Sequence, residues 1–531
     1  MPTHSNMERA LFGSALLLML GWAATSADAA ELTAAEARGK QIYTNGTSPS
    51  GADISAHMGV GGFPLPASVM PCASCHGPDG RGRPEGGVIP SDVTWGYLTR
   101  SYGHEHSYGR EHPAYTEATV ARAISHGLDP AGGRLEIAMP LYTMEPDDLD
   151  ALIAYMKRIE TDYDPGITPD SIRLATLLPL SGRMAPLGSA MRAVLDAYVD
   201  DLNAAGGING RTIELDVVPF GQSPEQALAN LDTAIARTGT FALLSPYSIG
   251  IETELARFAE EALLPLIAPY TLQPPARSAL DRYTFYLFSG DEQQVRILVE
   301  TVAEQHADQD PGLVVTGADS DAVRTLAKAL TKQIERRDWR APATLYYTAG
   351  DFDAPGLAGQ LRAADTGAVF FFGAPTELDA LLAEFVNDET VPLLLVPASR
   401  VARSLFEAPA IFDGRILTAY PRSPADVTAA GKSAYAALRE NHELSGEYAS
   451  AQLAVLAAVT MLDEALKRAG KHLSRESLIS ALEGLHEYET GLAPPLTFSL
   501  NRRIGALGAQ VVRLDLGRAT FVPEGEWRNL K

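Results

Sequence analysis

The chain of 531 residues contains only two cysteines, Cys72 and Cys75. A structural zinc site would use four ligands, usually from two cysteine pairs, and the sequence has no second pair. A disulfide between Cys72 and Cys75 would close a very small loop and would leave the adjacent His76 without a role. The scarcity of cysteine therefore argues against both structural uses and favours a local chemical motif.

Positive charge is also scarce, because 43 Lys and Arg residues stand against 66 Asp and Glu residues. The formal net charge of -23 argues against nucleic-acid binding and favours a soluble protein that meets basic or neutral partners. A hydrophobic content of 46% with 21% charged residues is that of ordinary globular protein. At this length we expect roughly two to four domains.

The apolar run near the N-terminus is too short for a membrane-spanning helix. It extends from Ala10 to Ala24, about 15 residues, whereas a spanning helix needs about 20. Arg9 precedes the run, and Ala27-Asp28-Ala29 follows it as a small-x-small cleavage pattern. We expect residues 1–29 to be a signal peptide for export to the periplasm, with a membrane anchor as the weaker alternative. The protein is then not membrane-spanning after cleavage.

The two cysteines stand in the motif Cys72-Ala73-Ser74-Cys75-His76, which is the pattern of c-type haem attachment. Thioether bonds from both cysteines would fix one covalent haem c, and His76 would ligate the iron. A thioredoxin-like redox pair would need a strand before the motif and a helix after it. The flanking segments, 59–71 and 77–87, are instead rich in Gly and Pro.

The region around this motif resembles class I cytochrome c. A helix is expected over Thr33 to Tyr43, and Gly39 and Tyr43 match the family's contact with a Leu-x-x-aromatic pair, here Leu152 and Tyr155. The resemblance implies an all-α cytochrome c domain over residues 31–160. It also implies that Met139, followed by Pro140, is the sixth iron ligand. The other candidates are Met144, then Met58 and Met70.

Two stretches of this region depart from the resemblance. The segment from Asn45 to Met70 separates the first helix from the haem motif, and its Gly, Ser and Pro content predicts a surface loop. His104, His106 and His112 lie close together in the sequence. Their spacing lacks helical logic, so we interpret them as part of a solvated loop, with a metal site as the alternative.

The character of the sequence changes after a linker at residues 161–170, which is rich in Asp, Pro, Gly and Thr. Strand-like and helical segments then alternate, which predicts parallel sheets with crossover helices and two doubly wound lobes over residues 171–531. Strands are expected at 172–180, 213–217, 241–244, 264–268, 313–315, 344–347, 369–372 and 393–396.

The second part is similar to the type 1 periplasmic solute-binding proteins of the Leu/Ile/Val class. The resemblance rests on Leu180-Ser181-Gly182, Gly188 and the run from Asn203 to Gly210. It implies two α/β lobes that close on a small-molecule ligand in the interlobe cleft, with an ABC permease as a possible partner. The fold class is therefore multidomain, with an all-α cytochrome c domain followed by a two-lobed α/β domain.

Ligands of open α/β sheets bind beyond the carboxyl ends of strands. The candidate ligand-binding residues in such loops are Ser245, Tyr247, Ser248, Tyr270, Thr271 and Arg400. The resemblance implies that the serines and Thr271 hold a ligand carboxylate, although Ser and Thr at such positions can equally cap helices. Arg400 indicates a negatively charged ligand, and a surface ion pair is its alternative.

No catalytic constellation is visible, so we do not expect an enzyme. The sequence predicts an exported mono-haem c-type cytochrome for electron transfer, fused to a solute-binding domain. Its partners would be a small molecule and a redox protein, either a dehydrogenase or a cytochrome. The alternative is a transport or sensory receptor with an accessory haem. A third hypothesis, that the haem domain is an enzyme, requires an open coordination position on the iron, which Met139 as a ligand would close.

Overall fold

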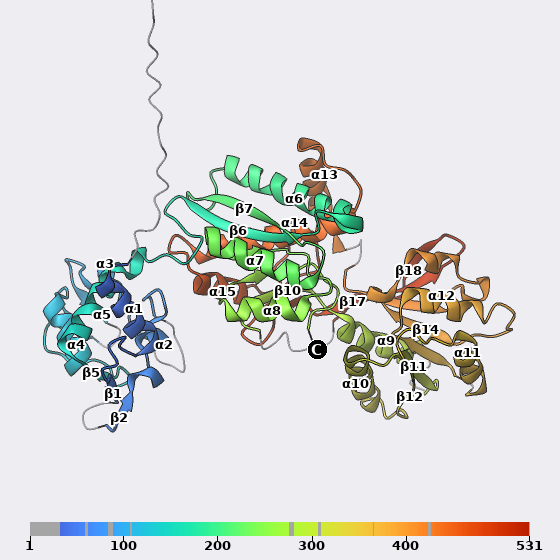
Figure 1. The fold of residues 1–531 in the computed structure, drawn as a ribbon, viewed down its shortest axis with the longest axis horizontal. Coiled ribbons are helices and arrows are strands. Elements are labelled where there is room, and N and C mark those ends of the chain that lie inside the picture. Colours follow the sequence, from blue (N-terminus) through green and yellow to red (C-terminus); the bar gives the residue numbers. More distant parts are fainter. Residues whose placement is uncertain are drawn as a thin grey trace, which may run out of the picture.

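The computed structural model places three bodies in a row, an N-terminal region followed by two α/β lobes (Figure 1). The expected signal peptide, residues 1–29, lies outside the described part of the chain. The structure describes residues 32–58, 62–82, 89–106, 109–275, 281–305, 310–364, 366–422 and 426–529.

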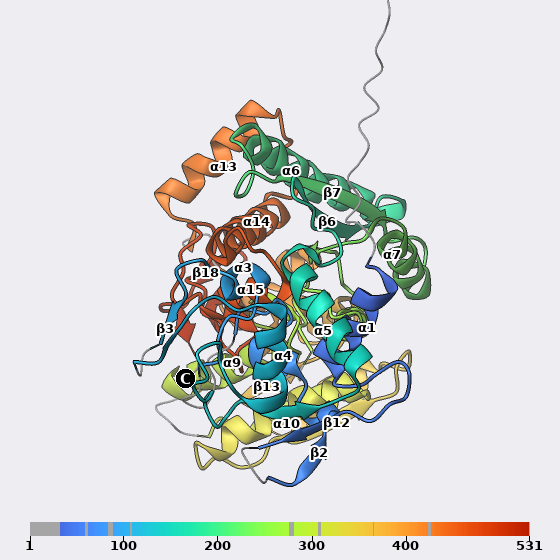
Figure 2. The same cartoon turned by 90° about the vertical axis from the view of Figure 1, so that its left-hand side faces the viewer.

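The N-terminal region is built around two crossing helices, α1 (Ala34–Asn45) and α5 (Pro146–Arg158). Thr33 starts α1 with a capping box, and Pro146 occupies the first turn of α5. Where the helices cross, a Cβ on Gly39 would lie 2.0 Å from the Ala151 carbonyl oxygen, so only glycine allows this approach. The predicted contact is confirmed, because the Tyr43 and Tyr155 rings pack at 5.7 Å between centroids. Figure 2 views this region end-on, with α1 and α5 side by side.

Short elements complete the region. They are α2 (Cys72–His76), α3 (Trp95–Leu98), β3 (His104–Glu105), β4 (Glu111–His112), α4 (Glu117–His126) and η2 (Ile159–Thr161).

The segment predicted as a surface loop, Asn45 to Met70, is instead partly ordered as a sheet. Its strands β1 (Ser55–His57) and β2 (Pro64–Pro66) pair antiparallel, and β1 also pairs with β5 (Leu141–Thr143). After β2, η1 (Ala67–Val69) begins with a buried alanine. The prediction failed because the partner strand β5 is distant in sequence, so local composition carries no sign of the pairing.

Lobe 1 contains a six-stranded parallel sheet in the order β16-β10-β9-β8-β6-β7. Its strands are β6 (Ser171–Leu178), β7 (Thr212–Pro219), β8 (Ala242–Leu244), β9 (Leu266–Ile267), β10 (Thr284–Phe288) and β16 (Ile504–Ala506). One hydrophobic cluster joins the sheet to α6 (Ala185–Ala204), α14 (Ala449–Ala469) and α15 (Arg475–Glu483). A second cluster joins it to α7 (Pro224–Thr238) and α8 (Glu252–Glu261), so both faces are covered.

Lobe 2 contains an eight-stranded sheet in the order β12-β11-β13-β14-β15-β17-β18, with β19 paired to β17. Its strands are β11 (Leu313–Ala318), β12 (Ala343–Tyr347), β13 (Ala368–Phe371), β14 (Leu393–Pro397), β15 (Ile416–Tyr420), β17 (Gly508–Asp515), β18 (Thr520–Pro523) and β19 (Arg528–Asn529). The helices α9 (Asp291–Gln305) and α10 (Asp321–Glu335) belong to one core cluster. Helices α11 (Ala354–Ala363) and α12 (Pro375–Ala383) belong to another.

The chain passes between the lobes three times, after β10, after β15 and after β16. The second passage leads to α13 (Ala429–Asn441) and α14. Helix α14 is long and apolar enough to span a membrane, with a mean hydropathy of 1.4, but 67% of that stretch is buried inside the structure. It is therefore a core helix of lobe 1, since it contributes residues such as Val455 and Leu462 to the central cluster.

The predicted linker, residues 161–170, is not a free spacer. Ile167 is buried in the lobe 1 core, and Tyr163 packs against the same cluster. The backbone N–H of Arg475 donates to Asp164 at 2.5 Å, which ties the connection to α15. Its Asp, Pro and Gly content signals a domain boundary, but composition does not reveal these tertiary contacts.

Candidate haem site and ligand-binding site

The two cysteines lie on the single turn of α2, three positions apart and therefore on the same side of the helix. Both are free thiols; Cys72 is partly buried against the core cluster of the N-terminal region and Cys75 is exposed. Burial raises the pKa of the Cys72 thiol to about 12, so this thiol is neutral. The pair thus presents two unbonded thiols at one side of a packed core.

His76 closes the same turn and is only 8% exposed. Its Nδ1 lies 2.8 Å from the carbonyl oxygen of Ser91, so Nδ1–H donates there and the lone pair is left on Nε2. Burial lowers the pKa of His76, which keeps the imidazole neutral. The backbone around it is held by two further bonds, from Tyr43 Oη to the Gly77 carbonyl and from Gly82 N–H to the His76 carbonyl, both at 2.7 Å.

The methionines of the region differ in burial. Met139 and Met144 are both partly buried against the core cluster that also contains Cys72. Met58 is 45% exposed. Met139 ends a turn, with its N–H bonded to the Glu136 carbonyl, and β5 follows it directly. A neutral imidazole with a free Nε2, two thiols and a partly buried thioether are the groups that hold haem c, so the residues present fit that group.

The histidine group is not the solvated loop that was predicted. His104 and His112 are buried and face each other across the β3–β4 pair, with ring centroids 4.9 Å apart. His106 Nε2 lies 3.0 Å from His112 Nε2. Among the described residues, no group of three or more His, Cys, Asp or Glu side chains has the arrangement of a metal site. The sequence spacing did not indicate the β3–β4 pairing, which packs the three rings together and buries His104 and His112.

The five candidate residues of lobe 1 come together at the carboxyl ends of β8 and β9. Tyr247 forms a parallel bridge with Tyr270, and their rings stack with centroids 6.4 Å apart. Ser248 Oγ lies 3.3 Å from the Tyr270 carbonyl, and Ser245 is buried with a φ of 46°. Thr271 Oγ1 donates to Glu252 Oε1 at 2.8 Å.

Glu252 is a residue of this site that the sequence reasoning missed. It opens α8, and its Oε2 accepts the Gly250 N–H at 2.9 Å while Oε1 accepts from Thr271. An acidic residue in the first turn of a helix that follows a strand-end loop was the available signal. Its carboxylate joins the two lobe 1 loops.

Arg400 lies in η5 (Ala398–Arg400), directly after β14 in lobe 2. Next to it is a second residue that was missed, Asp291, at the start of α9. Asp291 accepts the Ser399 hydroxyl at 2.5 Å, and its burial raises its pKa to about 6. Gln273 of lobe 1 approaches the same carboxylate at 3.5 Å, so Asp291 connects the lobes where the chain crosses between them.

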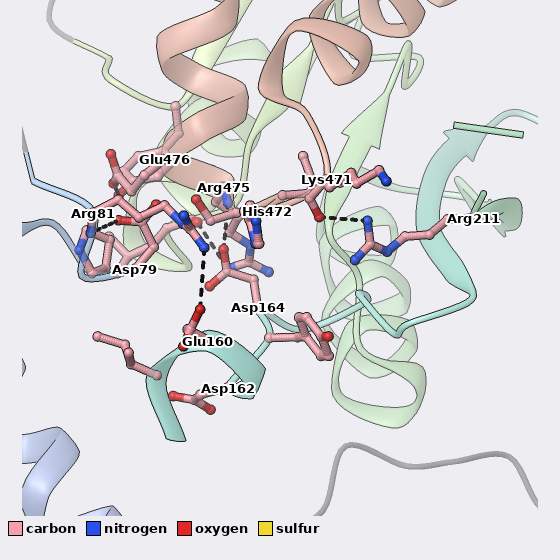
Figure 3. A pocket seen from close by; sticks show the side chains of 17 residues that line it. Asp79, Arg81, Glu160, Asp162, Asp164, Arg211, Lys471, His472, Arg475 and Glu476 are labelled. Atoms are coloured by element: carbon pink, nitrogen blue, oxygen red, sulfur yellow. Dashed lines mark hydrogen bonds and ion pairs between the residues drawn. The ribbon is translucent and has the colours of Figure 1, made fainter. Parts of the chain in front are cut away.

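A separate pocket of about 370 Å³ lies between the N-terminal region and lobe 1 (Figure 3). Arg81 and Glu160 come from the first region, whereas Arg211, His472 and Arg475 come from lobe 1. Arg81 approaches Glu160 at 4.0 Å and Asp92 at 3.8 Å. Acidic and basic groups alternate around this pocket, so it presents no single charge to a ligand.

Comparison with known protein families identifies both parts of the chain. The family model described as periplasmic binding protein matches residues 171–518, more than half of the chain. The chain belongs to the periplasmic binding protein family. The family model described as cytochrome c matches residues 37–160, so a cytochrome c domain precedes the binding domain and implies covalently bound haem c. Both families point to a location outside the cytoplasm.

The individual relatives are similar at low identity. A leucine-, isoleucine-, valine-, threonine- and alanine-binding protein of Pseudomonas aeruginosa is 24% identical over 40% of this chain and 57% of that protein. The chemotactic signal transduction system substrate-binding protein BasB of Halobacterium salinarum is 25% identical over 41% of this chain and 54% of that protein. The chain thus spans little more than half the length of these two relatives.

A solved structure shows the same fold. It is the fatty acid ABC transporter substrate-binding protein from Thermomonospora curvata, with a TM-score of 0.55 and 18% identity. The match covers 70% of this chain and 95% of that one. The two-lobed fold predicted from the sequence is confirmed, including the succession of a helical cytochrome c region and an α/β region. The first region is not purely α-helical, because it also contains the β2-β1-β5 sheet and the β3–β4 pair.

Proposed function

We propose that this protein is an exported mono-haem c-type cytochrome, an electron carrier, fused to a periplasmic domain that binds a small molecule between its two lobes. The signal peptide would comprise residues 1–29, the cytochrome c domain 31–160, the linker 161–170 and the binding domain 171–531. The observation that carries the proposal is the buried His76, held by Ser91 with its Nε2 free, on the turn that bears both cysteines.

In the cytochrome domain, Cys72 and Cys75 would attach the haem through thioether bonds, and His76 Nε2 and Met139 Sδ would hold its iron. The haem supplies one-electron chemistry when bound. If His76 and Met139 both held the iron, no iron position would be left for a substrate. The domain then acts as an electron carrier for a dehydrogenase or another cytochrome, and the protein is not an enzyme.

In the binding domain, Ser245, Tyr247, Ser248, Tyr270, Thr271 and Arg400 would line the small-molecule site. The names of the similar proteins range from amino-acid binding to fatty-acid transport, so relatives with this fold take ligands of different chemistry. The ligand class must therefore come from the residues of this chain.

A second candidate function is a receptor in which the haem is accessory. The similar chemotactic substrate-binding protein suggests sensing, and the similar ABC transporter protein suggests delivery to an ABC permease. The two functions differ in whether the haem turns over with a redox partner.

Two measurements test the proposal. We expect a covalent haem stain after denaturing electrophoresis of exported protein, and reduction of that haem by a dehydrogenase or cytochrome of the same cell envelope. We also expect a thermal-shift screen of small molecules to find a ligand, because a compound that binds only the folded state raises the melting temperature. If the haem is reduced but the screen finds no ligand, only the electron-carrier function is supported. If a ligand is found but the haem is not reduced, the receptor function is favoured.

A further inference from the structure

Two arginines leave the same edge of the lobe 2 sheet. Arg400 ends η5, directly after β14, and Arg422 stands two residues after the end of β15. These strands are parallel neighbours, with Pro397 opposite Ala419. Neighbouring strands run about 4.8 Å apart, and the carboxyl ends of parallel strands meet at one edge. The two arginines therefore lie in neighbouring loops at the sheet edge where open α/β sheets bind ligands.

Among the described residues, neither arginine forms an ion pair, although Arg400 is near enough to act on Asp291 through its charge, and Asp426 acts on Arg422 in the same way. Arg400 makes no hydrogen bond or ion pair within the described part of the chain, and its Nε is shielded from solvent without an acceptor. Arg422 donates only to the hydroxyl of Ser450, and its Nη1 is likewise shielded without an acceptor. In a chain with a net charge of -23, two arginines at one edge that make no ion pair, each with a shielded N–H group that has no acceptor, indicate room for a further anion.

Arg422 also reaches across to lobe 1. Its guanidinium carbon lies 5.8 Å from the centroid of the Phe288 ring at the end of β10, and Ser450 belongs to the first turn of α14. Burial raises the pKa of the Tyr270 hydroxyl, and the nearby charge of Arg422 opposes part of that rise. Arg422 thus stands between the lobe 2 edge and the aromatic side chains of lobe 1.

The facing loops of lobe 1 carry the opposite charge. The Glu252 carboxylate takes the donors of Gly250 and Thr271, while the Ser248 hydroxyl is within bonding distance of the Tyr270 carbonyl. Because the chain's own carboxylate occupies these donors, a ligand carboxylate on lobe 1 would meet like charge. The unused donors for an anion are on the lobe 2 side, at Arg400 and Arg422.

We propose that the ligand is an organic carboxylate with an apolar or aromatic body, whose carboxylate binds Arg400 and Arg422 and whose body packs against Tyr247 and Tyr270. Guanidinium groups suit this role because their planar donors match a carboxylate in two-point contact. The stacked tyrosines provide the apolar wall beside the charge. This proposal rests on the proposed small-molecule binding function and assigns its ligand class.

The test is calorimetric titration of the full-length holoprotein with three probes that share one skeleton: phenylpropanoate, L-phenylalanine and phenethylamine. Hexanoate serves as an aliphatic carboxylate. We expect at least one of the two simple carboxylates to bind and phenethylamine not to bind. Arg400→Gln and Arg422→Gln should each weaken the carboxylate by about tenfold or more, because a charged hydrogen-bond partner is lost.

Arg403→Gln is the matched control. Arg403 is exposed and lies three positions from Arg400, and the substitution removes the same charge. It should leave the affinity unchanged. If Arg422→Gln fails to fold, Arg400→Gln alone decides. The proposal is overturned if neither carboxylate binds at about 10 mM, if phenethylamine binds as tightly, or if Arg400→Gln binds like the parent.

The failure of this proposal can be told apart from failure of the proposed function. If L-phenylalanine or another compound of the thermal-shift screen binds while the simple carboxylates do not, a small-molecule site exists and its ligand class is different. If no compound in the screen binds, the binding function itself is contradicted.

Discussion

The cytochrome c domain and the two lobes of the binding domain build their cores in different ways. In the cytochrome domain, α2 and α3 have five and four residues, and no strand among its described residues exceeds three residues. In the lobes, α14 has 21 residues and lies mostly inside a single cluster, and seven of the eight residues of β6 are buried. Long elements bury enough apolar surface by themselves, whereas short ones do not.

The difference teaches where each part obtains its stability. In the cytochrome domain, Cys72 and Met139 are partly buried against one small core cluster and His76 is buried, and the covalent haem that the family implies would add to that core. The lobes cover both faces of each sheet with helices of the same chain. We therefore expect the two parts to respond differently to loss of the haem.

The largest effect is expected from removing both attachment points. Cys72→Ala with Cys75→Ala should abolish haem staining and remove the unfolding transition of the cytochrome domain, because the core loses its covalent group. The transition of the binding domain should remain. Differential scanning calorimetry measures both, with the parent protein as the reference. Persistent haem stain, or joint loss of both transitions, would contradict the comparison.

A smaller effect is expected at the sixth ligand. Met139→Ala should remove the thioether, change the spin state of the iron and lower the midpoint potential, because methionine ligation raises it. Met144→Ala is the matched control, since both residues are partly buried in the same cluster. Absorption spectra and a redox titration report the result. If only Met144→Ala alters them, the ligand assignment to Met139 is wrong.

Next comes the close packing of glycines, which both parts use. Gly39→Ala should destabilise the cytochrome domain by about 1–3 kcal/mol, since the added Cβ would lie 2.0 Å from the Ala151 oxygen. Gly188→Ala should do the same to the binding domain, where the Cβ would lie 2.2 Å from the Pro179 oxygen. Each change should lower the melting temperature of its own domain.

Gly359→Ala on α11 is the control for these variants. Nothing lies within 4 Å of its Cβ position, and alanine favours the helix by about 1 kcal/mol, so stability should rise. If Gly39→Ala or Gly188→Ala behaves in the same way, the close approaches are not tight in solution.

The smallest effect is a pH dependence confined to the binding domain. Asp291 has its pKa raised to about 6 by burial, above the usual value of 3.8. Between about pH 4 and 6 the folded state keeps a proton that the unfolded state has released, so stability falls as pH rises through this window. The full cost, on the order of 2–3 kcal/mol, persists above about pH 6.

Asp291→Asn should therefore flatten this part of the pH profile and raise the melting temperature at pH above 6, while an amide can still pair with Ser399. Asp200→Asn, at an exposed position of α6, removes the same charge and should not change the profile. Thermal melts between about pH 4 and 8 measure the difference. A profile that keeps its slope in Asp291→Asn would exclude Asp291 as its cause.

Much of the architecture was predictable because its signals are local. Capping at Thr33, Pro146 at the start of α5 and the spacing of Cys72, Cys75 and His76 all depend on neighbouring residues. The succession of parallel strands and helices after residue 171 follows from hydrophobic runs and turns. The predicted helix over Thr33 to Tyr43 and the predicted alternation of strands and helices are confirmed by the fold, since each element carries its own start, stop and buried face. The role of Cys72, Cys75 and His76 in holding haem stays a prediction.

What the sequence missed depends on partners distant in the chain. Strands β1 and β5 are about 85 residues apart, and the antiparallel strands β17 and β18 of lobe 2 were not foreseen. The same holds for the buried histidines of the β3–β4 pair and for the contact of Asp164 with Arg475. Short strands and polar contacts form only where a distant segment of the chain packs against them, and local composition does not specify that segment.

For the candidate site too, some features depend on local sequence and others on contacts between distant residues. The sequence by itself determined the haem motif and the strand-end loops of the binding domain. The motif is recognised by the spacing of its cysteines and histidine, and the loops by their position directly after predicted strands. Only the tertiary structure decided that Glu252 accepts the donors of lobe 1 while Arg400 and Arg422 make no ion pair with described residues on the other side. The physical reason is that the charge a ligand meets is the sum over residues brought together from several strands, and no single stretch of sequence contains that sum.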